Sequence, residues 1–481
     1  MKTLMSRALD LAKVRGAQYA DVRVVHNRTE SMSVRDGVVE SLNFSESEGF
    51  GVRVLADGAW GFASSRELSA AEIDQVTDQA LRIARASALV SEEKVALGPP
   101  VSSQGIYQTP LQIDPFKVPR EERLALLMAA DAEMAREKGI RTRRSNLTAW
   151  RDHKYFANTE GAFVEQTLTE TGGGIQATAV GGGEVQTRSY PNAFSRQQVT
   201  GGWEQLLSWD LPGNGARVAS EAVALLTADP CPANLTTTLI LGPTQLALQV
   251  HESCGHPTEL DRVFGSEAAY AGTSFLTTEK LGNFQYGSPV VNLTADSIRP
   301  LGLGTFGWDD EGVPAASTPL VKDGLFVGYL MSRETASRLG RVSNACMRAS
   351  GWNRIPIVRM INVSLEPGTW GFEDLVSDTD DGIYMEMNRS WSIDDKRYNF
   401  QFGTEIGYEI KNGKMGRLLR NCTYTGLTPE FWNSCDAVCS EKHWNMWGTP
   451  NCGKGQPGQT AHTGHGAAPA RFRNIRVGVL K

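Results

Sequence analysis

The segment QVHESCGHPTEL, residues 249–260, places the strongest local constraint on this chain. It carries His251 and Glu252 side by side, and a second histidine, His256, follows five positions after the first. Histidines that share a metal on a regular helix lie about four apart, because each residue turns the helix by about 100°. A spacing of five leaves the two imidazoles roughly 140° apart. A regular helix through this segment would therefore separate the two side chains.

Two residues of the segment predict that the helix is not regular. Gly255 can adopt the left-handed conformation that ends helices. Pro257 disfavours the α conformation at the residue before it, which is His256. We therefore expect the helix to stop or bulge at 254–255. His256 then need not obey the helical angle and can share a metal with His251.

The residue types fit a metal that activates water. Two neutral imidazoles suit zinc, and a third protein ligand would leave one coordination position for water. Glu252 could accept a proton from that water as a general base. The alternative is an exposed helix end on which Glu252 is an ordinary solvated charge. Histidines are scarce, with seven in 481 residues, and two of them fall in this hexapeptide, which favours the metal.

The spacing of the histidines does not choose the third ligand. Cys254 is poorly placed, because it sits inside the predicted bend. Cys435, Cys439 and His443 fall four apart. They could bind a separate structural metal, although a buried face of a helix is the commoner explanation. Cys452 lies in a Gly/Pro-rich segment, where a loop thiolate could reach a site on another element or have no role.

Composition describes an ordinary globular chain with more than one domain. Its 481 residues are 41% hydrophobic and 21% charged, and they exceed the usual size of a single core. The net charge of −6 gives no indication of nucleic-acid binding. No apolar run approaches the roughly 20 residues that span a bilayer, and the N-terminus lacks a signal peptide. Seven cysteines fit reduced thiols in a cytoplasm. We expect a cytoplasmic protein with neither nucleic acid nor membrane as partner.

The first half of the chain predicts helices packed on antiparallel strands. Alternating segments between residues 19 and 65 predict a strand meander with tight turns at RDG and ADG. A helix follows, signalled by the capping-box pair Ser69 and Glu72. A second helix–strands–helix block begins at Pro119, with its strands joined by glycines, Gly172–Gly174 among them. Two consecutive blocks predict a repeated layout.

The second half of the chain predicts a β-rich unit. After DPCPAN at 229–234, a strand leads into the histidine-bearing helix, and short alternating runs follow. We therefore predict an α+β protein whose C-terminal half is an antiparallel sheet or barrel with a metal-bearing helix. The predicted domains are residues 1–228, with sub-units of about 1–95 and 115–228, and residues 229–481.

Four segments of the chain carry a specific combined pattern. They are HESCGHPTELDRV at 251–263, GTFGWDDEGVPAASTPLVKDGLFVGYLMSRETA at 304–336, PIVRMINVSLEPG at 356–368 and CGKGQPGQ at 452–459. Together they resemble the TldD/PmbA family of metallopeptidases, specifically its TldD-like catalytic branch, and the match covers most of the chain. The resemblance implies an α+β N-terminal half and a β-rich C-terminal half. It also implies that His251, His256 and Cys452 bind one zinc ion per chain and that Glu252 is catalytic.

The resemblance implies a zinc-dependent peptidase that works as a dimer, either with itself or with a zinc-less PmbA-like (TldE) paralogue. We expect it to hydrolyse short or unfolded peptides. One alternative is a non-catalytic peptide-binding or partner subunit, because some members of the family lack the metal residues. Another is a metal hydrolase acting on non-peptide amides. His462 and His465 in the tail depart from the family's ligand pattern.

Two segments are candidates for substrate binding. The glycine-rich segment around Cys452, with Gly453, could let the backbone approach an extended peptide closely, which predicts tolerance of many sequences. Asp309, Asp310 and Glu311 could capture a peptide N-terminus or shape the site. The alternative for these three acids is a solvated turn.

Overall fold

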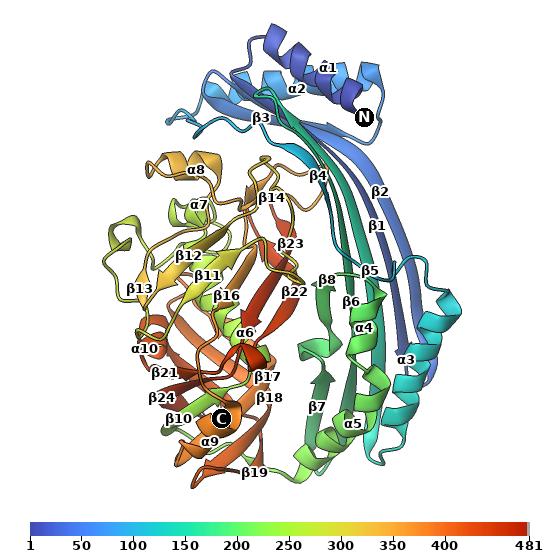
Figure 1. Cartoon of the computed structure of the whole chain (residues 1–481), viewed down its shortest axis with the longest axis vertical. Coiled ribbons are helices and arrows are strands. Elements are labelled where there is room, and N and C mark those ends of the chain that lie inside the picture. The colour runs from blue at the N-terminus through green and yellow to red at the C-terminus, as the bar shows by residue number, and fades with distance from the viewer. Residues whose placement is uncertain (479–481) are drawn as a thin grey trace.

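The computed structural model describes residues 1–478, which form two halves of different character. Long strands of the N-terminal half curve along one side of the compact C-terminal half (Figure 1). The N-terminal helices are α1 (Lys2–Val14), α2 (Ala70–Ala88), α3 (Arg120–Ala135), α4 (Trp203–Ser208) and α5 (Leu211–Thr227). The strands are β1 (Tyr19–Arg35), β2 (Val38–Ala56), β3 (Ala59–Ser65), β4 (Gln104–Gln108), β5 (Ile140–Asn158), β6 (Phe163–Gly181), β7 (Glu184–Tyr190) and β8 (Gln197–Thr200).

One continuous sheet carries the whole N-terminal half. Its order is β3-β2-β1-β5-β6-β4, and β7 and β8 also pair with β6. Antiparallel pairing of β1 with β5 joins the first helix–strands–helix block to the second. Helices α1 and α2 lie at one end of the sheet, and α3 and α5 lie toward the other (Figure 1). The two blocks therefore share one sheet instead of forming separate ones. Ser69 caps α2 as predicted, accepting the Glu72 N–H at 3.3 Å.

The strands are longer than the sequence predicted. The alternating segments between residues 19 and 65 merge into three strands, β1, β2 and β3. Gly172–Gly174, expected to join two strands, lie inside β6. The apolar pattern did not predict the strand lengths, because the surroundings of a long strand change along its length. Strand β2 is largely exposed in its first half and buried in its second. The turns at Asp36–Gly37 and Asp57–Gly58 are confirmed, with the positive φ typical of tight hairpins.

The C-terminal half contains a barrel, as the predicted fold class allowed. Its five strands are β10 (Leu235–Leu241), β17 (Asp381–Ile393), β18 (Asn399–Lys411), β20 (Thr423–Leu427) and β24 (Ala470–Val477). The barrel closes because β17 pairs with both β10 and β18. The pair β10–β17 is parallel, so the barrel is not antiparallel throughout. Short strands β9 (Asp229–Pro230), β19 (Lys414–Arg420) and β21 (Cys435–Val438) extend it.

A six-stranded sheet lies beside the barrel. In spatial order its strands are β13 (Leu325–Phe326), β12 (Ser317–Lys322), β11 (Leu293–Asp296), β16 (Asn362–Leu365), β23 (Gln459–Ala467) and β22 (Asn445–Lys454). The remaining elements are β14 (Met347–Arg348), β15 (Ile357–Val358), α6 (Pro243–Val250), α7 (Leu260–Val263), α8 (Arg333–Ser337), α9 (Phe372–Ser377) and α10 (Thr428–Asn433). No helix within residues 1–478 has both the length and the apolar character needed to cross a bilayer. The domain boundary at 228/229 stays a prediction.

Buried ion pairs join the two halves. Arg53 on β2 lies 2.7 Å from Asp21 and 3.2 Å from Glu311, which belongs to the C-terminal half. Asp310 lies 3.7 Å from Arg23 on β1. Arg53, Asp21 and Glu311 are each at most 2% exposed, so their charges are stabilised by one another and not by water.

The acids at 309–311 are therefore not a solvated turn, and that alternative is wrong. Their exposed fractions are 3%, 6% and 1%. Asp309 accepts the backbone N–H groups of Glu311, Val313 and Met347, which folds the segment onto β14. The sequence could not show this burial, because it depends on partners far along the chain, such as Arg23, Arg53 and Met347.

Replacing Glu311 with Ala should destabilise the protein strongly. The change leaves the buried Arg53 without one of its two carboxylates and leaves the Arg333 N–H, now bonded to Glu311 at 2.8 Å, without an acceptor. Breaking a buried pair in this way costs about 3 kcal/mol or more. Denaturant unfolding followed by circular dichroism measures the loss. Asp74→Ala, which removes an exposed ion pair with Arg7, is the matched control and should change the midpoint little. Equal midpoints for the two variants would contradict the prediction.

Candidate metal centre

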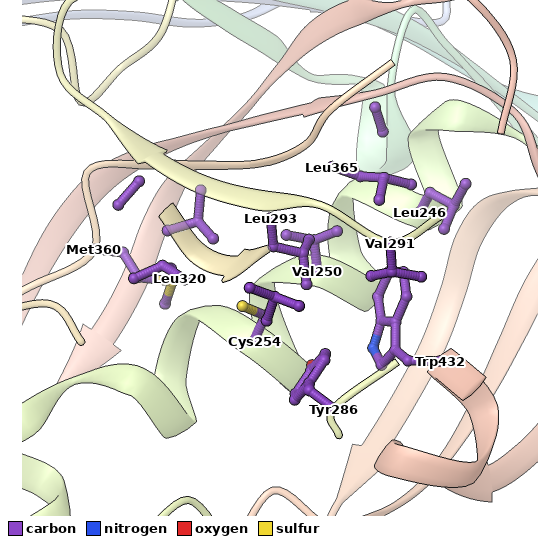
Figure 2. Close-up of a cluster of buried hydrophobic side chains, with 14 of the residues drawn as sticks. Leu246, Val250, Cys254, Tyr286, Val291, Leu293, Leu320, Met360, Leu365 and Trp432 are labelled. Carbon is purple, nitrogen blue, oxygen red and sulfur yellow. The ribbon is translucent and has the colours of Figure 1, made fainter. Parts of the chain in front are cut away.

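Helix α6 brings the histidine segment into the core of the C-terminal half. Pro243 occupies its first turn, where the missing N–H is tolerated. Leu246, Val250 and Cys254 recur every four residues and point into a buried apolar cluster with Tyr286, Val291, Leu293, Met360 and Trp432, as Figure 2 shows. Leu248 lies on a different side and lines a cavity. The apolar face fixes the rotation of the helix and so decides which side chains face that cavity.

The helix changes character at the histidines. Residues His251–Gly255 form a π-helical turn, in which the His256 N–H bonds the His251 carbonyl five residues back. A turn that closes over five residues places residues five apart on the same side. The ring centroids of His251 and His256 are 4.9 Å apart. The expected bulge is confirmed, but its conformation is not the expected one. Gly255 has φ −55° and His256 has φ −60°, so both stay right-handed.

Surrounding side chains satisfy the carbonyls that the irregular turn leaves free. Pro257 has no N–H to offer the carbonyl four residues earlier, on Ser253. The Tyr286 hydroxyl donates to that carbonyl at 2.8 Å. Thr258 Oγ1 donates to the carbonyls of Cys254 and Gly255. Gly255 is needed for space and not for left-handed backbone, because a Cβ there would overlap Met360.

Cys452 reaches the histidines from a strand and not from a loop, which corrects the prediction. It lies near the end of β22, where the pairing with β23 shifts register between Thr449 and Cys452. Its Sγ lies 3.6 Å from His256 Nε2. The donor atoms of His251, His256 and Cys452 all lie within 4.8 Å of one another, and all three residues are at most 5% exposed. Among residues 1–478 this is the one such group of three or more potential ligands.

The donor atom types, and the one separation of two donors that reflects direct contact, fit a zinc ion. Zinc binds imidazole nitrogen at about 2.0–2.1 Å and thiolate sulfur at about 2.3 Å in tetrahedral sites, which holds neighbouring ligand atoms roughly 3.4–3.7 Å apart. The 3.6 Å between Cys452 Sγ and His256 Nε2 falls within that range. Two nitrogens and one sulfur also match the ligand types of known catalytic zinc sites.

Hydrogen bonds orient both imidazoles with one nitrogen free. His465 Nδ1 lies 2.9 Å from the Val363 carbonyl and must carry the proton, so its Nε2 is an acceptor. His251 Nδ1 therefore donates to His465 Nε2 at 2.7 Å, which leaves His251 Nε2 unprotonated. His256 Nδ1 donates in the same way to Glu259, at 3.0 Å. Such partners hold ligand imidazoles in place in metal sites. Sequence reasoning missed the role of both His465 and Glu259.

A buried charge network connects the helix to the hairpin that carries Cys452. Glu259 lies 3.4 Å from Lys454 Nζ and 3.7 Å from Arg359. The Arg359 guanidinium donates to the Cys452 carbonyl at 2.7 Å. Lys454 also pairs with Asp261 at 2.6 Å. These contacts hold the two ligand-bearing elements together.

Burial and charge set the protonation of the three candidate ligands. Burial lowers the pKa of His251 and, more strongly, of His256, so both rings are neutral near pH 7. Burial works against ionisation of the Cys452 thiol, but the neighbouring His256 and Arg359 outweigh it and lower the pKa overall. Neutral imidazoles and an ionised thiol are the forms that bind zinc.

Glu252 lies beside the three donors in a cavity of about 280 Å³. It is 6% exposed, and its carboxylate accepts a hydrogen bond from Arg397 Nη1 at 2.6 Å. Gly453, a predicted substrate-binding residue, lines the same cavity. The acids at 309–311, also predicted to bind substrate, are not among the residues of the described chain that line this cavity.

The remaining sequence candidates lie elsewhere. Cys435 is on β21 and His443 is in a short turn, so the predicted helical face shared with Cys439 is wrong. His443 Nε2 accepts the Phe372 N–H at 3.3 Å. His462 lies 2.7 Å from Glu170 and lines a second cavity, of about 330 Å³.

His465→Ala should weaken zinc binding about tenfold to a hundredfold, because His251 then loses the acceptor that fixes its proton and its ring. Competition with a chromophoric chelator measures the affinity. His443→Ala is the control and should leave it unchanged. Unchanged affinity in His465→Ala would refute the orienting role.

Comparisons with known proteins find metalloproteases and one structure of the same fold among the relatives of this chain. A metalloprotease of Methanocaldococcus jannaschii is 28% identical over 94% of this chain and 95% of its own length. A zinc metalloprotease TldD homolog of Saccharolobus solfataricus is 23% identical over 50% of this chain and 51% of its own length. The solved structure of TldE from Thermococcus kodakarensis has the same fold, with a TM-score of 0.73 at 18% identity, over 98% of this chain and 99% of that one.

Three family profiles cover nearly the whole chain. They are described as PmbA/TldA metallopeptidase domain 1, central domain and C-terminal domain, and they match residues 20–84, 113–228 and 235–479. The chain therefore belongs to the PmbA/TldA metallopeptidase family, the TldD/PmbA family that its motifs resemble, and is a metallopeptidase.

Proposed function

We propose that this metallopeptidase is zinc-dependent and hydrolyses short or unfolded peptides, with His251, His256 and Cys452 as ligands and Glu252 as general base. The observation that carries the proposal is the convergence of three buried donor atoms beside a carboxylate in one cavity. The relative from Saccharolobus solfataricus, named as a zinc metalloprotease, supports the choice of metal. When bound, zinc acts as a Lewis acid that polarises a carbonyl and acidifies water.

The chain's own groups would divide the remaining work. The Glu252 carboxylate accepts the proton of the attacking water and delivers it to the leaving amine. Arg397, at 2.6 Å from that carboxylate, would hold it in position before the transfer. His465 and Glu259 keep the unprotonated nitrogens of the two ligand imidazoles aimed at the site.

The edge of the six-stranded sheet would hold the substrate. Strand β22 is the outer strand of that sheet, and Gly448, Thr449, Asn451, Cys452 and Gly453 line the cavity. Closer to the start of β22, the Gln197 side chain already occupies this edge, because its Oε1 accepts the Gly448 N–H at 2.9 Å. An extended peptide that pairs with such an edge is bound through its main chain, which supports tolerance of many sequences. Assembly with itself or with a TldE-like paralogue, and a cytoplasmic location, stay predictions.

Glu252→Gln should abolish peptide cleavage while leaving zinc in place. The amide cannot accept the proton, and general-base catalysis is worth about a hundredfold to ten-thousandfold in rate. Fluorogenic peptide hydrolysis measures the rate, and elemental analysis measures about one zinc per chain in both proteins. A variant that still cleaves at the parent rate would remove Glu252 from the mechanism.

Cys452→Ala should lower the zinc content at limiting zinc, because a single side chain supplies the third ligand. His462→Ala, which removes a histidine outside the donor group, is the control and should retain the metal. A parent chain that binds no zinc would favour the alternative of a non-catalytic peptide-binding subunit.

A further inference from the structure

A short strap from the N-terminal half borders the cavity of the C-terminal half. It comprises residues 192–197 and runs from just after β7 to the first residue of β8. Phe194 and Ser195 have φ of 60° and 54°, a left-handed conformation that non-glycine residues seldom adopt. Asn146 Nδ2 donates to the Ser195 carbonyl and to its hydroxyl oxygen, both at 2.9 Å, which holds the strap in that conformation.

The glycines inside β6 make room for the strap. A Cβ at Gly174 would overlap the Ser195 carbonyl. Close approach of the strap therefore explains Gly172 and Gly174, whereas a Cβ at Gly173 would overlap Asn146 and Leu206. Strained backbone that its surroundings hold in place is commonly found at functional sites and ligand-binding segments.

The strap presents one aromatic and one cationic side chain to the cavity. Phe194 is 39% exposed, and its ring lies 6.1 Å from that of Trp391, which is 47% exposed. The Arg196 guanidinium lies 5.3 Å from the Phe194 ring. Phe194, Arg196 and Trp391 line the same cavity as His251 and Glu252.

Arg196 differs from the other arginines around it. Arg397, in the same cavity, is paired with Glu252. Arg144, in the adjoining cavity, lies 2.9 Å from Glu40. The Arg196 guanidinium has no hydrogen bond or ion pair with any residue of the described chain, and burial lowers its pKa without an opposing acid. A half-buried guanidinium of this kind gains most from an anionic ligand with two oxygens, which its planar fork matches.

We propose that Arg196 forms a carboxylate-binding subsite beside the metal centre, which selects peptides that carry a carboxylate close to the cleaved bond. The proposal rests on the proposed function and deepens it by naming a substrate class. The carboxylate could be the C-terminus of the peptide or an acidic side chain. The cavity, about 280 Å³, lies at the small end of ligand pockets and suits a short segment. Phe194 and Trp391 would contact an apolar part of the same ligand.

Binding can be tested without turnover in the zinc-loaded Glu252→Gln protein. Three fluorescent peptides are compared by anisotropy. Two share one neutral sequence and end in a free carboxylate or in a carboxamide. The third ends in a carboxamide and has one internal residue of that sequence replaced by glutamate. We expect one of the acidic peptides to bind about tenfold to a hundredfold more tightly than the neutral one, because a charge-assisted bond is gained. Which acidic peptide is preferred identifies the source of the carboxylate.

Introducing Arg196→Gln into the Glu252→Gln protein should remove that preference, because only the affinity for the acidic peptide falls. Arg196→Lys should retain part of the preference. Arg144→Gln is the matched control and should keep the full preference, because Arg144 is already paired. Equal binding of all three peptides, a preference that survives Arg196→Gln, or an equal loss for every peptide would overturn the proposal. Hydrolysis is measured separately with the unmodified chain, so absence of cleavage would count against the proposed function and not against the subsite.

Discussion

The hydrogen bond from the His256 N–H to the His251 carbonyl is the constraint on which the metal centre depends. It replaces the bond that an α-helix would make to Glu252 and adds one residue to the turn. The added residue rotates His256 back toward His251. Pro257 and Tyr286 make the arrangement stable, because the proline withholds a donor and the tyrosine supplies one to the same carbonyl.

The third donor comes from a different layer, and buried charges position it. Glu259 follows the histidines closely in sequence, yet its carboxylate contacts Arg359 and Lys454 on other elements. Arg359 in turn holds the carbonyl of Cys452. Several fully buried charges are tolerated here because each is paired. The network makes the spacing between His256 and Cys452 a property of the fold and not of a flexible loop.

The N-terminal half lines the cavity beside the three donor residues as well as supporting the C-terminal half. Its sheet is attached through Arg53 and Glu311 near one end and through Arg188 and Glu405, 3.2 Å apart, elsewhere. This attachment brings the strap of residues 192–197 to the cavity mouth. A chain cut near residue 228 would therefore lose Phe194 and Arg196 from the site while keeping every metal donor.

The sequence by itself determined the α+β class, the irregular helix end and the pair of histidines that the structure brings together, because these depend on local pattern and on the conformational limits of glycine and proline. It could not determine how the turn would break, and its expectation that Pro257 moves His256 out of the α conformation was wrong. Only the tertiary structure decided that His465 and Glu259 orient the imidazoles, that the acids at 309–311 are buried, and that Arg196 is left without a partner. The physical reason is that hydrogen bonds and ion pairs between residues far apart in the chain leave no periodic signal, and their geometry exists only after the sheets have packed.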